Sequence, residues 1–342
     1  MKFFVRGGVA ALALCATAAI LAPYAEAQTP YYQGKTVRLV VGFTPGGGYD
    51  TYARLLSRHF GNHIPGKPNV IVENMPGAGS LTAVRWLDGP APKDGTAITA
   101  FNPGLITQGM LDEKVGRLNF LDYAWVGNIA RDQRVCYLWA GKGTKGVKTF
   151  ADFQKQKGWV FGTTGVGAAN WVNQRTLQRV FDVDLKIITG FPGSPEQRLA
   201  VERGELDGDC GSWTSIPEDW RANKLVTPIL KLSKALPPDA PTDVPWANDV
   251  AKSDEDRAVL NVLNGAGEIG RPYIISKQVP GNVLDILRKS FDATMADKAF
   301  IADGEKAQLP VDPMTGDEVV TMLGQIYAAP PAAVEKAKAI TQ

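Results

Sequence analysis

The stretch VRLVVGFTPGGGYD (37–50) places three consecutive glycines and an aspartate directly behind a short apolar run. Residues 36–42 are rich in valine, with Arg38 as the single charge, and this pattern predicts a buried strand. Apolar side chains then recur at helical spacing over 49–60, which predicts a helix. The glycine loop therefore joins the end of a buried strand to the start of a helix.

The same alternation continues along the chain. Strands are predicted at 70–72, 97–101, 125–129, 135–139, 159–162, 185–188, 206–209 and 226–232, and helices at 80–87, 150–157, 170–181 and 196–203. A proline-rich segment, 236–246, follows, and the chain from Asp254 onward is mostly helical in pattern. Strand–helix–strand order favours right-handed crossovers and parallel sheets. Two α/β lobes are expected, lobe 1 from 28–130 plus 236–342 and lobe 2 from 131–235, with hinges near 127–132 and 228–236.

The first 27 residues have the organisation of a cleavable secretory signal peptide. Lys2 and Arg6 precede the apolar stretch 9–22, and Ala25-Glu26-Ala27 supplies an A-x-A cleavage site. That stretch is shorter than the ~20 residues that a spanning helix needs, which disfavours an uncleaved anchor. We expect export to the periplasm of a Gram-negative cell, a mature chain from Gln28, and no membrane insertion after cleavage.

Charge and cysteine content narrow the possible partners. The chain has 37 Lys and Arg residues against 35 Asp and Glu residues, without a long basic run, which argues against a nucleic-acid partner. Cys136 and Cys210 remain after the signal peptide, and in an oxidising compartment such a pair tends to form a disulfide. Buried free thiols are the alternative.

Several catalytic classes lack their signatures. The loop GFTPGGG does not fit the G-x-G-x-x-G nucleotide pattern. His59 and His63, the only histidines, flank Gly61 without the H-E-x-x-H pattern, so they are predicted to be an exposed helix-end pair and not a metal site. G-x-S-x-G is absent from the sequence. No cofactor or metal is expected, and an enzyme is disfavoured; the rival is a periplasmic enzyme with Asp50 or Asp207 as general base.

The glycine loops favour anion binding instead. A helix start presents unpaired N–H groups and the positive end of its dipole, and glycine lets a ligand approach the backbone closely. A turn without a ligand is the alternative for the first loop alone. Further glycine loops occupy 76–80, 163–170 and 190–194. Loops at the carboxyl ends of parallel strands face one crevice, so we expect a small anion held between two closing lobes.

At these loops the sequence resembles the periplasmic solute-binding proteins of tripartite tricarboxylate transporters, the Bug family. The motifs that carry the resemblance are VRLVVGFTPGGGYD (37–50), VIVENMPGAGS (70–80), APKDGTAI (91–98), and a GVG loop followed by GELDG (204–208). The resemblance covers nearly all of the mature chain. The resemblance implies a two-lobed type II periplasmic-binding-protein fold with the ligand cleft between the lobes.

The resemblance also implies which residues hold the ligand. On lobe 1 they are Thr44, Gly46, Gly47, Gly48, Tyr49 and Asp50, and on lobe 2 they are Thr164, Gly165, Gly167, Ala168, Ala169 and Asn170. The other glycine loops add Gly79 and Ser80 on lobe 1 and Phe191 on lobe 2 to the predicted ligand residues. The family commonly has a small hydroxyl residue at position 49, serine, proline and histidine at 168–170, and an aspartate at position 211, where this chain has glycine. Tyr49, Phe191, Trp171 and Trp213 could form aromatic walls for a bulkier carboxylate, or lie in the core.

The predicted function is that of an exported, non-catalytic and monomeric receptor. It captures a small carboxylate and delivers it to a tripartite tricarboxylate-type membrane transporter; a sensing input to a membrane sensor is the alternative. The ligand charge is expected to be compensated by helix N-termini and loop amides, without an arginine.

Overall fold

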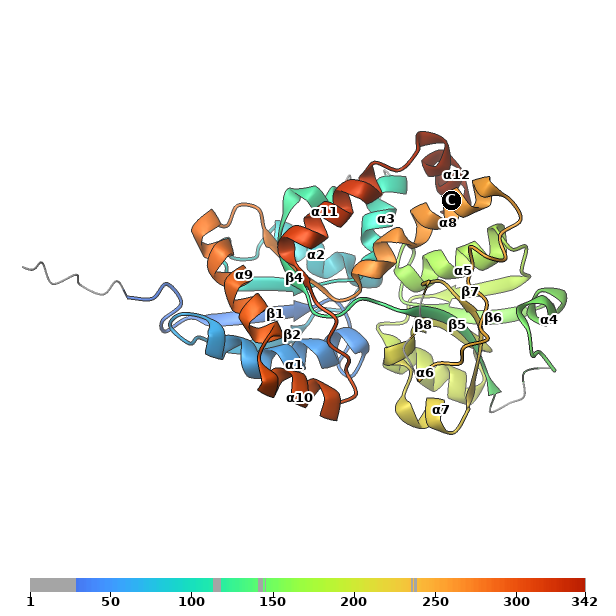
Figure 1. The fold of residues 1–342 in the computed structure, drawn as a ribbon, viewed down its shortest axis with the longest axis horizontal. Helices are drawn as coiled ribbons and strands as arrows, with labels where there is room; N and C mark the ends of the chain where they lie inside the picture. The colour runs from blue at the N-terminus through green and yellow to red at the C-terminus, as the bar shows by residue number, and fades with distance from the viewer. Residues whose placement is uncertain are drawn as a thin grey trace, which may run out of the picture.

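Two sheets flanked by helices form two lobes that lie side by side (Figure 1). The computed structural model describes residues 29–112, 118–140, 144, 146–234, 236 and 239–341. The predicted signal peptide, 1–27, lies outside the described residues. Within them, no helix is long and apolar enough to cross a membrane.

The sheet of lobe 1 is mixed, not parallel as predicted. Its order is β11 (Met314–Thr315), β4 (Tyr123–Asn128), β10 (Pro272–Ser276), β3 (Ala97–Ala100), β1 (Thr36–Val41) and β2 (Asn69–Asn74). Strand β1 pairs in parallel with β2 and β3, whereas β10 is antiparallel to both β3 and β4. The late strand β10 therefore enters the middle of a sheet that the N-terminal strands begin.

The sheet of lobe 2 is also mixed, and here its first strand is the antiparallel one. Its order is β7 (Leu185–Thr189), β6 (Trp159–Thr163), β8 (Gly208–Ser212), β5 (Arg134–Trp139) and β9 (Val226–Lys231). Strands β6, β7 and β8 run parallel, and β5 is antiparallel to its neighbours β8 and β9. Cys136 and Cys210 lie directly opposite each other in β5 and β8 and form a disulfide.

Helices cover both faces of each sheet and bury their apolar stripes there. Lobe 1 carries α1 (Gly48–His63), α2 (Leu81–Asp88), α3 (Gly104–Leu111), α9 (Gly281–Met295), α10 (Lys298–Lys306) and α11 (Gly316–Tyr327). Lobe 2 carries α4 (Phe150–Lys155), α5 (Ala169–Arg179), α6 (Ser194–Arg203) and α7 (Glu218–Ala222). His59 and His63 in α1 each contact an aspartate near α10, Asp303 at 3.0 Å and Asp297 at 2.9 Å. Both histidines thus connect two helices of lobe 1.

The predicted lobe boundary at residue 236 differs from the observed packing. Ala240, Val244 and Ala247 lie in the hydrophobic clusters of lobe 2, and so does Leu260 of α8 (Asp254–Gly265). The chain returns to lobe 1 only after α8, through Ala266–Ile269 and Gly270 into β10. The predicted second hinge at 228–236 is therefore wrong, because the proline-rich segment lies along lobe 2.

The C-terminal helix joins the two lobes. Helix α12 (Pro331–Thr341) packs with α3 of lobe 1 and with α5 and α8 in one apolar cluster, to which Ala337 and Trp171 contribute (Figure 1). The lobes are thus connected by two crossings near residues 130 and 270 and by this helix.

Candidate functional site

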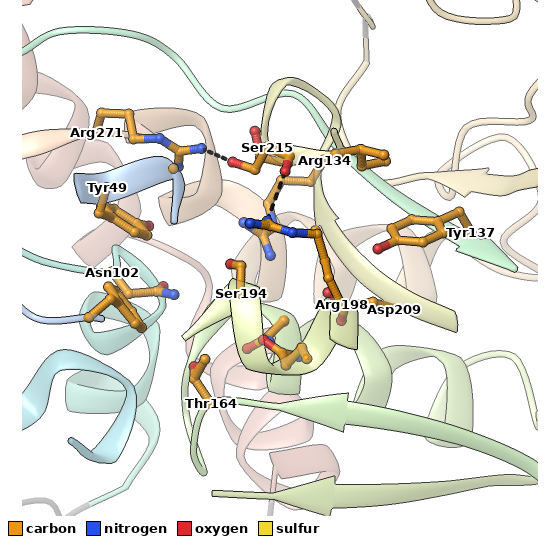
Figure 2. Close-up of a pocket in the computed structure, with 17 residues that line it drawn as sticks. Tyr49, Asn102, Arg134, Tyr137, Thr164, Ser194, Arg198, Asp209, Ser215 and Arg271 are labelled. Carbon is orange, nitrogen blue, oxygen red and sulfur yellow. Dashed lines mark hydrogen bonds between the residues drawn. The ribbon is translucent and has the colours of Figure 1, made fainter. Parts of the chain in front are cut away.

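A small cavity of about 60 Å³ lies between the lobes. Lobe 1 contributes Phe43, Gly48, Tyr49, Asn102 and Arg271, and lobe 2 contributes Arg134, Tyr137, Thr164, Asn170, Ser194, Gln197, Arg198, Asp209, Gly211, Ser212, Ser215 and Ile216. Figure 2 shows their side chains converging on one space from opposite sides. Side chains of both lobes therefore line one polar cavity.

The first glycine loop is shaped by Asp50. Its Oδ2 accepts hydrogen bonds from the N–H of Gly46 and from Nε of Arg54, both at 2.8 Å. Its Oδ1 accepts a hydrogen bond from Nδ2 of Asn74 at 2.9 Å. Gly46 takes a positive φ of 81°, which favours glycine. Burial opposes ionisation of Asp50, but these hydrogen bonds hold the pKa of its carboxyl below the ordinary value. Asp50 therefore holds the loop and lies outside the cavity wall.

Three helices begin at the cavity. Helix α1 starts at Gly48, α5 at Ala169 beside Asn170, and α6 at Ser194. A Cβ on Gly48 would come within 2.3 Å of Oγ of Ser215, so a larger residue there would require Ser215 to move. The positive ends of three helix dipoles therefore point toward one small space, as the loop pattern predicted.

Three arginines also line the cavity, which corrects the expectation of a site without arginine. Nη1 of Arg134 and Nη1 of Arg271 lie 2.7 and 3.5 Å from Oδ2 of Asp132, a buried residue on the first crossing. Burial alone would raise the pKa of Asp132, but Arg271 and Arg134 outweigh it and lower this pKa. Arg271 also lies 4.6 Å from the ring centroid of Tyr49 and donates to Oγ of Ser215 at 2.8 Å.

Arg198 is bound by neutral groups only. Its Nη1 donates to the carbonyl of Ser215 at 3.2 Å, and its Nη2 donates across the lobes to the carbonyl of Gly46 at 3.3 Å. Among the described residues, no carboxylate lies within ion-pair distance of Arg198. Burial lowers the pKa of its guanidinium from the ordinary value. Arg198 nevertheless stays charged at neutral pH, because the ordinary value for arginine is so high. Asp209, Glu196 and Glu202 act on this charge from a longer distance. Within the described parts of the chain, Arg198 therefore has no direct counter-ion.

Asp209 places a carboxylate on the same wall. Its Oδ1 accepts the N–H of Cys210 at 2.7 Å and Nε2 of Gln174 at 3.1 Å. Burial raises the pKa of Asp209 to about 6, although the Cys210 N–H and Arg134 oppose the rise. The ionised form therefore predominates at pH 7 at a cost to stability that disappears at acidic pH.

Other buried polar atoms at the cavity have no partner within the described parts of the chain. They are Oγ1 of Thr164, Nε2 of Gln197, and Nε of both Arg134 and Arg271. Buried polar groups in folded proteins are nearly always hydrogen-bonded. These atoms therefore provide free hydrogen-bonding capacity at a positively charged site between the lobes.

The predicted ligand residues fall into two groups. Gly48, Tyr49, Thr164 and Asn170 line the cavity. Most of the others lie where the lobes touch: Thr44 donates to Glu196 at 2.9 Å, Gly47 faces Ser194 and Pro195, Gly79 faces Gly165 and Ala168, Gly167 faces Gln108, and the N–H of Ala169 donates to Asn102 at 3.1 Å. Two more make contacts within their own lobe, since Ser80 accepts the N–H of Asn102 and Phe191 packs against Gly162. These loops thus form much of the contact between the lobes.

Gly104→Ala is expected to hold the lobes apart. A Cβ at Gly104 of lobe 1 would lie 2.3 Å from the backbone nitrogen of Ala169 in lobe 2. Because such overpacking costs roughly 1–3 kcal/mol, separation of the lobes relieves it most simply. Small-angle X-ray scattering should show a larger radius of gyration. Gly324→Ala is the control, since no atom lies within 4 Å of its Cβ position; equal radii for the two variants would contradict the prediction.

Of the predicted aromatic walls, only Tyr49 reaches the cavity. Its ring stacks on Phe43 at 4.8 Å, and burial raises the pKa of its hydroxyl to about 12. Trp171 and Trp213 are buried in apolar clusters, and Phe191 packs against the cluster that holds Trp213. Those three rings therefore belong to the packing of the lobes.

The sequence analysis missed the charged part of this site. Ser194, Gln197 and Arg198 share one face of α6 at i, i+3 and i+4, a spacing that was visible directly after the fourth glycine loop. Arg134 stands out as a charge within the apolar strand β5. Arg271 gave no local signal, because only the fold brings it to Asp132.

Comparisons with known proteins bear on the fold of the chain. No protein-family model matches the chain. It is 28% identical over 258 residues to the UPF0065 protein in the TAR-I ttuE-ttuC' intergenic region of Agrobacterium vitis, which covers 74% of this chain and 71% of that one. Among solved structures, the periplasmic binding protein BugD matches with a TM-score of 0.71 and 21% identity over 90% of this chain and 98% of its own.

A second solved structure is MatC from Rhodopseudomonas palustris with bound malate. It matches with a TM-score of 0.68 and 19% identity over 90% of this chain and 99% of its own. These similarities confirm the predicted two-lobed periplasmic-binding-protein fold and the resemblance to binding proteins of the Bug type.

Proposed function

We propose that this chain, a relative of Bug-type periplasmic binding proteins, closes its lobes over a small organic anion in the periplasm and delivers it to a tripartite tricarboxylate-type membrane transporter. The observation that carries the proposal is the cavity between the lobes, lined by three arginines and by the starts of three helices. Asp132 pairs with Arg134 and Arg271, and Asp209 lies on the same wall as Arg198, so the three guanidinium groups outnumber these two carboxylates. A carboxylate ligand would complete this balance.

A binding role fits the acidic residues better than catalysis does. Asp50 is fixed by the loop that it supports, and Oδ2 of Asp207 accepts the N–H of Val160 at 2.8 Å, away from the cavity. Neither candidate general base faces the space where a substrate would lie.

A thermal-shift screen tests the proposal directly. The mature protein is heated with mono-, di- and aromatic carboxylates, with amino acids, and with the matching neutral amides. A ligand at ~100 times its dissociation constant adds roughly 2.7 kcal/mol, which raises the melting temperature by several degrees. A rise with an acid but not with its amide supports an anion receptor. Rises with neutral or cationic compounds alone would contradict it. For transport, deletion of the gene should abolish uptake of that acid.

Arg198→Met is expected to weaken binding of that acid roughly 10- to 100-fold, because a hydrogen bond to a charged group contributes about 1.5–3 kcal/mol. The free protein should stay folded, since Arg198 leaves no carboxylate unpaired when it is removed. Arg257→Met is the control, because Arg257 pairs with the exposed Asp254 outside the cavity. Calorimetric titration measures both variants; unchanged affinity in Arg198→Met would remove Arg198 from the site.

A further inference from the structure

Asp209 has one carboxylate oxygen that the protein does not use. Oδ1 already accepts two hydrogen bonds, from Cys210 and Gln174. Oδ2 has no hydrogen bond from any residue that the structure describes, and it lies 3.5 Å from the position of a Cβ on Gly211. Apart from the chain neighbours of Gly211, no other atom of the described residues lies within 4 Å of that Cβ position. Because Gly211 has no side chain, the space beside Oδ2 remains part of the cavity.

The two sides of the cavity differ in chemistry. Figure 2 places Arg271 and Tyr49 on one side and Asp209 and Tyr137 on the other, with Arg198 between them. An anionic group fits beside Arg271 and Arg198. Beside Asp209 a second anionic group would face a carboxylate, and like charges in contact cost several kcal/mol. This side therefore favours a hydrogen-bond donor.

We propose that Oδ2 of Asp209 accepts a hydrogen bond from an amino or hydroxyl group of the ligand. The preferred ligand is then a small carboxylic acid that also carries such a donor, not the plain acid of the same skeleton. This inference rests on the proposed function, since it assigns the chemistry of the anion that the cavity holds. The charge of Asp209 at pH 7 agrees with it, because an ionised carboxylate offers only acceptors.

Matched acids that differ only at the carbon beside the carboxylate test the inference. The series are propanoate, L-lactate and L-alanine; succinate, L-malate and L-aspartate; and 3-phenylpropanoate, L-phenyllactate and L-phenylalanine. In the series that binds, the hydroxy or amino acid should bind at least roughly tenfold more tightly than the parent acid in calorimetric titration. A parent acid that binds as tightly as both derivatives overturns the Asp209 inference alone. Absence of binding in all three series overturns the proposed function itself.

Substitution of Asp209 separates ligand contact from support of the fold. In Asp209→Ala the preference for the donor-bearing acid should fall to about twofold or less, while the parent acid binds at least as tightly as before. A purely structural role would weaken all acids of a series equally, and that result would overturn the inference. Asp207→Asn is the matched control, because Asp207 lies two residues earlier and outside the cavity. Its preference should be unchanged, and far-UV circular dichroism checks that each variant is folded.

Discussion

Asp132→Asn is expected to lower the free energy of unfolding by about 3–5 kcal/mol, because it leaves two buried guanidinium groups without their counter-charge. Oδ2 of Asp132 lies 2.7 Å from Nη1 of Arg134 and 3.5 Å from Nη1 of Arg271. The side chains of all three residues are at most 8% exposed, so water cannot replace the lost charge. The loss should therefore exceed that of any surface ion pair in the protein.

The position of this cluster makes the effect global. Asp132 follows the first crossing between the lobes, and Arg271 ends the second, where its N–H donates to the carbonyl of Ala130 at 3.1 Å. Gly270, directly before Arg271, takes a positive φ of 74°, and a Cβ there would lie 2.3 Å from the carbonyl oxygen of Ala130. The ion cluster thus holds the two crossing segments against each other.

Urea unfolding followed by tryptophan fluorescence measures the effect. Asp312→Asn is the control, since its pair with Arg131 is long, at 3.8 Å, and about half exposed, so little change is expected. Replacing Asp132, Arg134 and Arg271 together with apolar residues of similar volume should recover much of the lost stability. A cost below about 1 kcal/mol for Asp132→Asn would mean that water reaches the cluster and that the lobes are not closed in solution.

The pH dependence of this contribution has a defined sign. The pKa of Asp132 is lowered in the folded protein, so its stabilisation is complete above the unfolded value of about 3.9 and is lost as pH falls through the folded value. The difference in stability between the wild type and Asp132→Asn should therefore narrow below pH 4. Asp209 acts in the opposite direction, because its folded pKa is about 6. The contribution of Asp209 to stability is complete below pH 4 and is lost as pH rises through 6.

Much of the strand and helix order was predictable because these elements have strong local patterns. Strand β1 and helix α1 were expected within a few residues of their observed ends. Strand β10 was missed, since its five residues are buried on both faces and show no alternation. Its antiparallel place between β3 and β4 depends on partners far away in the sequence. The mixed character of both sheets therefore could not be read from strand order.

The site, too, has parts that the local sequence predicts and parts that depend on distant residues. Glycine loops before helices have local signatures, and the three helix starts at the cavity lie in predicted loops. A buried charge is allowed only when the fold supplies its partners, and the partners of Arg271 are distant in sequence. Asp50 lies in a predicted loop and was expected to bind the ligand, but its carboxylate instead accepts the N–H of Gly46 within that loop.

The double substitution Cys136→Ala with Cys210→Ala is expected to lower the free energy of unfolding by about 4 kcal/mol, because the disulfide closes a long loop in the unfolded chain. The two cysteines are 74 residues apart, and both are fully buried in the core of lobe 2. Urea unfolding with and without dithiothreitol measures the effect. The wild type should lose stability in the reductant, whereas the variant should not respond. A wild type that is equally stable in both buffers would indicate that the thiols are not paired.

Loss of the disulfide should also weaken ligand binding, although neither cysteine lines the cavity. The N–H of Cys210 donates to Oδ1 of Asp209, and its carbonyl accepts Nη2 of Arg134 at 3.2 Å. The backbone of this one residue thus orients a carboxylate and a guanidinium of the site. Mild reduction that leaves the protein folded should lower affinity for the bound acid. If affinity were unchanged under those conditions, the hydrogen bonds of strands β5 and β8 would be sufficient to hold both groups in place.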